Sequence, residues 1–355
     1  MAKIIFKQDI PRFLDLLQEK YLVWAPVRAN KNLLSAQQDD FIFAPLNPYG
    51  SRPSTPTQLA LNYPTTIIPP LKNAFFPPQE ILFTWQNDPT SVAKGDLRGT
   101  NKISEPAKIP DQVLFGVHLY DIHAIALMND VTRFPVRDDL WRERLAKTLI
   151  IGISHEPQEY HFWGAIGLDI HTGYDLFLQD IGKAYAILEG SDKGKKLIAN
   201  LNFIKDVPIP EKSQEKPQDK LLNLPLIEKV VKKGAKSKIW DKLAKICFGC
   251  GICAYVCPLC YCFETSDWIS LDGKSGSRSR RWDACFLPNF FAIAGVNPKE
   301  KLRDRIYNWY HHKFVRFPAE YGRVGCIGCG RCIHYCPAKI NFREVLEDLE
   351  KEAAE

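Results

Sequence analysis

The sequence predicts an α+β protein in which an N-terminal α/β domain is followed by a mainly helical C-terminal domain. Three observations support this prediction. Apolar runs of strand length alternate with helical patterns in the first 204 residues, a charged segment rich in lysine and proline follows, and every cysteine lies beyond residue 246. The chain of 355 residues is also longer than the roughly 250–300 residues at which a single hydrophobic core stops growing.

The N-terminal domain is predicted to span residues 1–204. An apolar stripe at helical spacing predicts a helix over residues 10–21. The apolar runs 113–117 and 148–153 are typical of buried strands, and the helical pattern of residues 121–129 between them completes a β-α-β unit.

Further strands are predicted at residues 173–178 and 184–188, followed by a lysine-rich helical piece that ends at Ile204. Nine prolines between Pro45 and Pro78 exclude long helices and central strands there and favour an extended segment with turns.

Residues 205–238 are predicted to form a solvated linker, because they contain nine lysines, five acidic residues and four prolines. The alternative is a docking arm whose charge is matched by a partner. The second domain then spans residues 239–355.

Composition and charge argue against several classes of protein. A net charge of +6 is modest for this length and does not indicate a nucleic-acid-binding protein. The longest apolar stretch, residues 113–128, is interrupted by His118, Asp121 and His123 and falls short of the ~20 residues of a membrane-spanning helix. The first nine residues lack the apolar core of a secretory signal, so we expect a cytoplasmic chain.

The eleven cysteines lie between Cys247 and Cys336, and without a secretory signal such clustering indicates metal binding rather than a disulfide framework. Two runs match C-x2-C-x2-C-x3-C-P, the pattern that binds [4Fe–4S] clusters. At this spacing three thiolates surround three irons of one cubane, and the intervening glycines let the backbone approach its sulfides. A zinc ribbon uses two C-x2-C pairs and needs no third close cysteine. Two complete runs therefore predict two [4Fe–4S] clusters.

The fourth cysteine of each run is predicted to serve the cluster of the other run, as in two-cluster proteins of this pattern. The predicted ligands of the first cluster are Cys247, Cys250, Cys253 and Cys336. Those of the second cluster are Cys326, Cys329, Cys332 and Cys257.

The 68 residues between Cys257 and Cys326 exceed the connection of a compact bacterial ferredoxin. Asn297 as N-cap, Pro298 at the first helical position and an apolar stripe predict a helix that ends near Phe314. The sequence therefore favours an α-helical ferredoxin-like domain over the compact β-rich form.

Three further cysteines, Cys260, Cys262 and Cys285, are interpreted as alternative ligands, redox-active thiols or buried small side chains, and the last interpretation is favoured. Eight arginines between Arg278 and Arg331 either raise cluster potentials and recruit an acidic partner or form a solvated basic face.

No nucleophile motif, P-loop or dinucleotide fingerprint is present in the sequence, so no catalytic residue is predicted. His311 and His312 are expected at the surface.

Motifs in one order along most of the chain resemble the beta subunit of cytoplasmic sulfhydrogenases, which are NAD(P)-linked heterotetrameric [NiFe] hydrogenases. More distantly they resemble the A-type subunit of anaerobic sulfite reductase. The matching segments are residues 24–27, 65–70, 115–118, 257–262, 271–273 and 280–285 and the second cysteine run.

This resemblance implies a non-catalytic electron-transfer subunit that binds neither nickel nor flavin. Its partners would be the small and large hydrogenase subunits and a flavoprotein subunit that reduces NAD(P)+ or sulfur compounds. The alternatives are the same role in a sulfite- or sulfur-reducing complex, and a stand-alone ferredoxin-type carrier or assembly scaffold.

One departure separates this chain from the family it resembles. Relatives carry cysteines where this sequence has Tyr120, His155, His161 and Trp163. If those cysteines hold a further metal site in relatives, we expect that site to be missing here, which leaves two clusters rather than three. His155 and His161 as ligands of another metal are the alternative.

Overall fold

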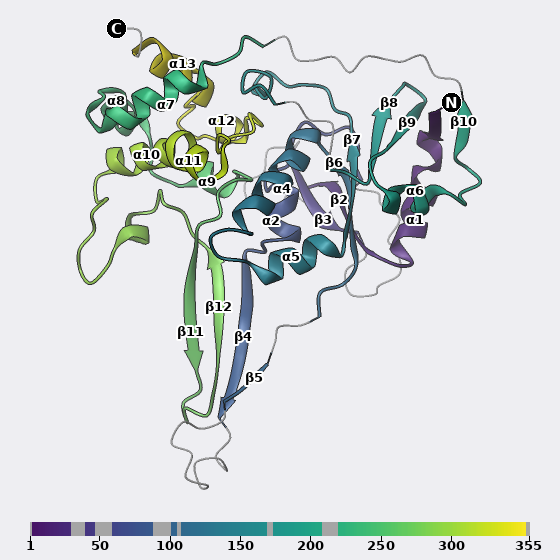
Figure 1. Ribbon diagram of the computed structural model, residues 1–355, viewed down its shortest axis with the longest axis horizontal. Helices are drawn as coiled ribbons and strands as arrows, with labels where there is room; N and C mark the ends of the chain where they lie inside the picture. Colours follow the sequence, from purple (N-terminus) through teal and green to yellow (C-terminus); the bar gives the residue numbers. More distant parts are fainter. Residues whose placement is uncertain are drawn as a thin grey trace.

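The computed structural model describes residues 2–29, 40–46, 59–87, 101–104, 108–168, 173–207 and 219–352. A large sheet with helices on both faces lies at the N-terminal end and a group of helices at the C-terminal end, and a second sheet projects between them as a narrow arm (Figure 1). The predicted fold class, a mixed α/β region followed by a mainly helical cysteine-bearing region, is confirmed.

The large sheet has eight strands in the order β10-β1-β9-β8-β7-β6-β2-β3. Neighbouring strands from β8 to β2 are parallel, and the remaining pairs are antiparallel. The bounds are β1 Ala2–Phe6, β2 Leu22–Arg28, β3 Phe41–Pro45, β6 Gln112–Val117, β7 Thr148–Ile153, β8 Leu176–Asp180, β9 Ala184–Glu189 and β10 Lys205–Val207.

Strands β6 and β7 are buried along their whole length, as expected for parallel strands covered on both faces. Alternate residues point to opposite faces, so Val113 and Ile151 pack with helix α1 while Leu114 and Ile150 pack with helix α4. The predicted β-α-β unit is confirmed.

The helices of this region are α1 Ile10–Gln18, α2 Pro70–Ala74, α4 Leu119–Val131, α5 Asp139–Ala146 and α6 Asp192–Ile198. The predicted helix 10–21 ends at Gln18, because β2 begins at Leu22 and the residues between form the turn that leads into it. The proline-rich segment holds only the five-residue helix α2 among its described residues, in agreement with the prediction. Residues 47–58 of that segment lie outside the described residues.

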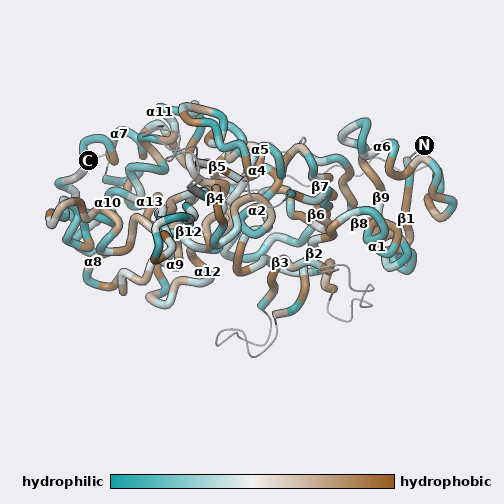
Figure 2. The backbone as a smooth tube through the Cα atoms, turned by 90° about the horizontal axis from the view of Figure 1, so that it is seen from below, coloured by the Kyte–Doolittle hydropathy of each residue, from teal (hydrophilic) through white to brown (hydrophobic). Residues whose placement is uncertain are grey.

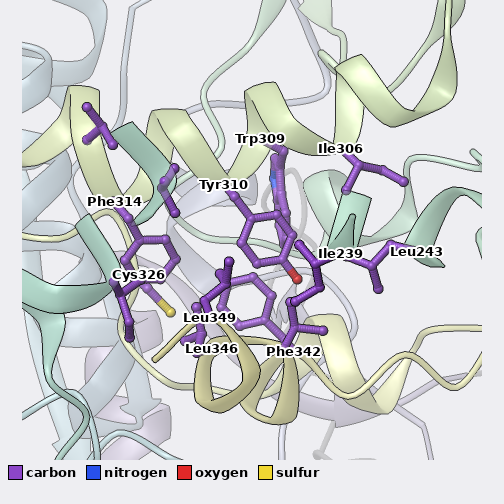
Figure 3. Packing of buried hydrophobic residues seen from close by; sticks show 14 of the residues in the cluster. Ile239, Leu243, Ile306, Trp309, Tyr310, Phe314, Cys326, Phe342, Leu346 and Leu349 are labelled. Carbon is purple, nitrogen blue, oxygen red and sulfur yellow. The ribbon is translucent and has the colours of Figure 1, made fainter. Parts of the chain in front are cut away.

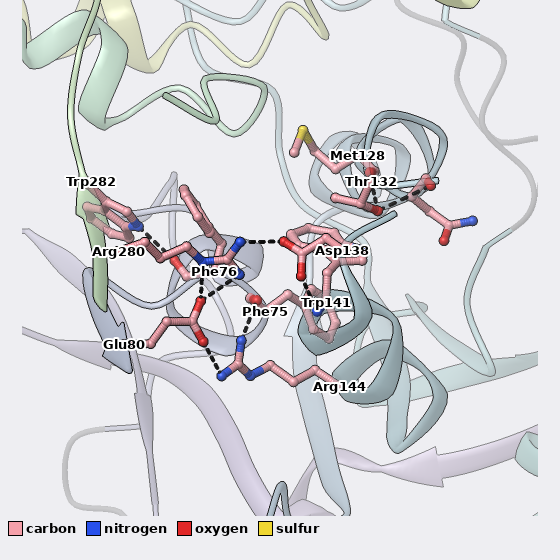
Figure 4. Close-up of polar contacts among 11 residues, drawn as sticks. Phe75, Phe76, Glu80, Met128, Thr132, Asp138, Trp141, Arg144, Arg280 and Trp282 are labelled. Carbon is pink, nitrogen blue, oxygen red and sulfur yellow. Dashed lines mark hydrogen bonds and ion pairs between the residues drawn. The ribbon is translucent and has the colours of Figure 1, made fainter. Parts of the chain in front are cut away.

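The arm is a four-stranded antiparallel sheet in the order β11-β12-β4-β5, and it joins distant parts of the chain. Its strands are β4 Gln79–Asn87, β5 Asn101–Ser104, β11 Phe263–Ile269 and β12 Ser275–Trp282. The two segments that the sequence assigns to separate domains therefore share one sheet. Arg280 donates to Glu80 at 2.6 Å and to Asp138 at 2.5 Å at the root of the arm, and Arg144 also donates to Glu80 at 2.6 Å (Figure 4).

The C-terminal region is mainly helical, as predicted. Its helices are α7 Leu224–Lys233, α8 Ile239–Ile246, α9 Ile252–Tyr255, α10 Leu302–His311, a π-helical turn His312–Arg316, α11 Phe317–Tyr321, α12 Arg331–His334 and α13 Phe342–Glu352. Trp309 and Tyr310 of α10 pack on Phe342 of α13, with ring centroids 5.1 and 5.0 Å apart (Figure 3). Among the described helices, none is long and apolar enough to cross a membrane.

The linker prediction for residues 205–238 is wrong over two parts of the segment. Lys205–Val207 forms β10, which pairs with β1, and Leu224–Lys233 forms α7. The apolar stripe of α7, made of Ile227, Val230 and Val231, is buried in the C-terminal core although lysines surround it in the sequence. In Figure 2 the tube near α7 accordingly carries both hydrophilic and hydrophobic colours. Residues 208–218 lie outside the described residues.

The predicted start of the helix at Pro298 is also wrong. Helix α10 begins at Leu302, because the side chain of Asn297 caps a turn instead, where its Oδ1 accepts from the Lys299 N–H at 3.0 Å.

Candidate metal centres

The first cysteine set lies at the junction of α8, α9 and α12. Cys247, Cys250, Cys253 and Cys336 line one cavity, so the structure brings together all four residues that the sequence assigns to the first cluster. The remaining wall is apolar and includes Leu243, Ile306, Tyr310 and Phe342, which Figure 3 shows around the same space.

The pKa shifts of the thiols describe the same grouping. Burial raises the pKa of Cys253, and the thiolates of Cys247, Cys250, Cys336 and, as the smallest contribution, Cys257 raise it further. Cys336 therefore lies with the first run although it belongs to the second.

The second cysteine set lies deeper, where the C-terminal helices meet the N-terminal region. Cys326 and Cys329 are buried, at 9% and 7% exposure, whereas Cys250 of the first set is exposed. Burial raises the pKa of Cys332 well above its ordinary value, and the thiolates of Cys329, Cys326, Cys257 and, as the smallest contribution, Cys253 raise it further. Cys257 of the first run raises the pKa of Cys326, Cys329 and Cys332 and also that of Cys253, so it lies close to both sets and its assignment to the second cluster stays a prediction.

The two runs have matching backbones. Gly249 and Gly251 have φ of +67° and +75°, and Gly328 and Gly330 have φ of +63° and +67°, values that favour glycine. In each run the second glycine precedes a short helix, α9 or α12. Gly249 N–H donates to Cys247 Sγ and Gly328 N–H donates to Cys326 Sγ, both at 3.4 Å. The turns thus direct backbone donors at sulfur.

These residues fit [4Fe–4S] clusters. Each set supplies four sulfur donors, and the raised thiol pKa values imply that a bound metal group displaces protons from these side chains. No three His, Cys, Asp or Glu side chains among the described residues are arranged to hold a single metal ion.

Two buried lysines near the second set were missed by the sequence analysis. Lys313 Nζ donates to Cys257 Sγ at 3.2 Å and to Gly325 O at 2.9 Å. Lys72 Nζ donates to the carbonyl oxygens of Ala254 and Tyr255, at 3.2 and 3.0 Å. Lys313 follows the apolar stripe of α10 at helical spacing. A lysine at a position of the buried face is the sequence signal from which its burial could have been predicted.

The arginines of this region do not form a single solvated face. Arg280, Arg305 and Arg331 are buried, at 6%, 6% and 0% exposure. Arg305 donates to Phe286 O at 2.9 Å, and Arg331 forms an ion pair with Asp121. The interpretation of the arginines as a solvated basic face is therefore wrong for these three.

The three remaining cysteines lie close to the clustered thiols: Cys260 is hydrogen-bonded to Cys257, and Cys262 and Cys285 are hydrogen-bonded to each other. Cys260 and Cys285 are buried, and Cys262 is half-buried. A hydrogen bond from Cys260 is the largest cause that lowers the pKa of Cys257, and the positive charge of Lys313 lowers it further. The role of all three cysteines stays a prediction.

His312 is not a surface residue, contrary to the prediction. It is half-buried, its Nε2 lies 3.2 Å from Tyr261 Oη, and burial lowers its pKa to about 4.

The four positions at which cysteines are expected in relatives converge in space. Ring centroids of Tyr120 lie 5.1 Å from His155 and 5.3 Å from His161, and His155 lies 6.5 Å from Trp163. His118 stacks on His155 at 4.2 Å. His161 Nδ1 accepts from the Gln158 N–H at 3.0 Å, which places the proton of the neutral ring on Nε2 and disfavours metal binding there.

Comparison with known proteins gives two matches. The 4Fe-4S dicluster domain family matches residues 246–340, which contain every cysteine of the chain. Sulfhydrogenase 2 subunit beta of Pyrococcus furiosus is 31% identical over 359 residues, and the match covers 98% of each chain. No solved structure matches. The predicted cofactor content, two [4Fe–4S] clusters, is thereby confirmed.

Proposed function

The chain belongs to the family of sulfhydrogenase beta subunits, and from this we propose that it transfers electrons within a cytoplasmic [NiFe] hydrogenase-like complex. It relays them between the hydrogenase subunits and a flavoprotein subunit that reacts with NAD(P). The chain itself is an iron–sulfur protein and, like its relative, one subunit of a larger assembly.

The observation that carries this proposal is the placement of the two cysteine sets, one at the surface and one enclosed. Each cluster, when bound, accepts and releases one electron. Cys250 is exposed, and its neighbour Phe248 is 71% exposed. Cys332, a predicted ligand of the second cluster, also lines the first cavity, so the two sets adjoin. This arrangement supports a path from an external partner through the first set to the second.

We further propose crossed ligation of the two clusters, which would support the same path. We assign Cys336 to the first set and Cys257 to the second, on the cavity lining and the charge coupling of the thiols. Each run then contributes to both clusters, which fixes the distance between them. We propose no reaction for the chain itself.

Anaerobic purification of the tagged chain from its native host tests the proposal. We expect about eight irons per chain from two cubanes, EPR signals on reduction, and co-purification of a nickel-containing hydrogenase subunit with a flavoprotein. A partner that carries siroheme would replace this proposal with a role in sulfite reduction. A chain that holds reducible clusters as a stable monomer without partners would indicate a stand-alone carrier.

A further inference from the structure

Lys313 places a buried positive charge against one cysteine sulfur. It lies on the π-helical turn His312–Arg316 and is 5% exposed. Its Nζ donates to Cys257 Sγ at 3.2 Å and to Gly325 O at 2.9 Å, and lies 5.0 Å from the centre of the Trp309 ring. Single π-helical turns often occur at functional sites, and here the turn carries the residue that contacts Cys257 and the residue directly before Cys326.

We propose that Lys313 raises the reduction potential of the cluster ligated by Cys257, so that this cluster accepts electrons from the other one. The proposal rests on the proposed function, because it takes Cys257 as a cluster ligand. It adds a direction to the electron path inside the chain.

The physical reason is the charge that reduction adds. A [4Fe–4S] cluster with four thiolates is an anion, and reduction adds one further negative charge. A cation and a hydrogen bond to a ligand sulfur stabilise the reduced state more than the oxidised state. Burial strengthens this difference, because little solvent screens the charge.

The surroundings of the first cysteine set differ from those of the second, and the difference supports a lower reduction potential for the first cluster. Its cavity is walled by apolar side chains, and two of its sulfurs, those of Cys247 and Cys336, accept backbone N–H groups of Gly249 and Ile340 at 3.4 Å. These donors are neutral, and the nearby buried Arg305, whose charge lowers the pKa of Cys247, donates to carbonyl oxygens rather than to sulfur. Near the second set, the charge of Arg331 is balanced by Asp121, which leaves Lys313 as a cation bonded to sulfur.

An EPR-monitored redox titration of the full chain tests the proposal with the variants K313M, K313Q and K313R. Methionine removes both the charge and the donor, glutamine keeps a donor without charge, and arginine keeps both. The matched control is K72M, because Lys72 is also buried, at 3% exposure, but donates to carbonyl oxygens instead of sulfur. The variant C329S identifies which signal belongs to the second cluster.

We expect K313M to lower the midpoint potential of the second cluster and to leave that of the first unchanged, with the full iron content retained. The shift should be smaller in K313Q and smallest in K313R. An unchanged potential in K313M, an equal shift of both clusters, or an equal shift in K72M would overturn the proposal. Loss of the cluster in all three Lys313 variants would also overturn it, since the residue would then be structural. Absence of reducible clusters in the wild-type chain is a different result, which refutes the proposed function itself.

Discussion

Arg331 and Asp121 form a fully buried ion pair that ties the second cysteine run to helix α4. The guanidinium donates to both carboxylate oxygens, at 2.7 and 2.6 Å, and the side chains are 0% and 1% exposed. Arg331 also donates to Thr66 O at 2.8 Å. Two residues 210 positions apart thus connect the N-terminal sheet to the loop that carries the second set.

The substitution D121N is expected to destabilise the protein strongly. It keeps the shape of the side chain but leaves the charge of Arg331 buried without a counter-charge, and breaking a buried pair in this way costs about 3–5 kcal/mol. Urea unfolding of the anaerobic protein, followed by tryptophan fluorescence, measures the change. The control is D267N, because the Asp267–Arg278 pair is 40% and 46% exposed and solvent screens such pairs, which therefore contribute little to stability. Equal losses in the two variants would contradict this account.

The matched glycines of the two runs should differ in their tolerance of a side chain. A Cβ on Gly328 would lie 2.4 Å from Trp163 N, whereas a Cβ on Gly249 would lie 3.4 Å from the Leu302 side chain. Both residues have positive φ, so either alanine variant loses about 1 kcal/mol or more. In G328A the new methyl group also has to displace the backbone at Trp163, which adds about 1–3 kcal/mol to the loss of stability.

Iron retention and urea unfolding compare the two glycine variants. We expect G328A to lose iron and stability to a greater degree than G249A. A G249A variant that is as unstable as G328A would show that backbone conformation, rather than contact with the N-terminal region, governs this position.

Cysteine variants test the crossed ligation. C257A should remove the second cluster and C336A the first, so that each retains about four irons but shows a different remaining EPR signal. C260A is the control, since Cys260 lies three residues from Cys257 and is buried but is not a predicted ligand. If C257A and C247A lose the same cluster, the ligation is not crossed.

Local patterns predicted much of the N-terminal sheet. Strand β7, Thr148–Ile153, matches its prediction residue for residue, because a continuous apolar run is bounded by polar residues on both sides. The arm was not predicted, since β12 has the sequence SGSRSRRW and no apolar alternation, and its partner β4 lies about 200 residues away. Such pairing depends on contacts that no local pattern contains.

In the candidate site too, local spacing was informative, whereas contacts between distant residues were not predicted. The cysteine spacing predicts that Cys336 lies near Cys247 and Cys257 near Cys326, and the cavity lining and thiol charges agree with this proximity, whereas the crossed ligation stays a prediction. Lys313 and Arg331 were not recognised, because charged residues are usually exposed and the sequence does not reveal that their partners are Cys257 and Asp121.

The buried histidines predict a loss of stability in mild acid. Burial lowers the pKa of His155 to about 4 and that of His161 to about 3, whereas an unfolded histidine titrates near 6.5. Below about pH 6.5 the unfolded chain therefore binds more protons than the folded chain. The stability that the neutral rings contribute is fully present above that pH and is lost as the pH falls toward 4, by up to about 1.4 kcal/mol per pH unit for each ring.

The variant H161N tests this prediction, because its amide oxygen can accept the Gln158 N–H but does not titrate. Between pH 6.5 and 5, the free energy of unfolding in urea should depend less steeply on pH than in the wild type. The decrease in slope should correspond to at most one proton. An unchanged slope would mean that His161 is protonated in the folded protein.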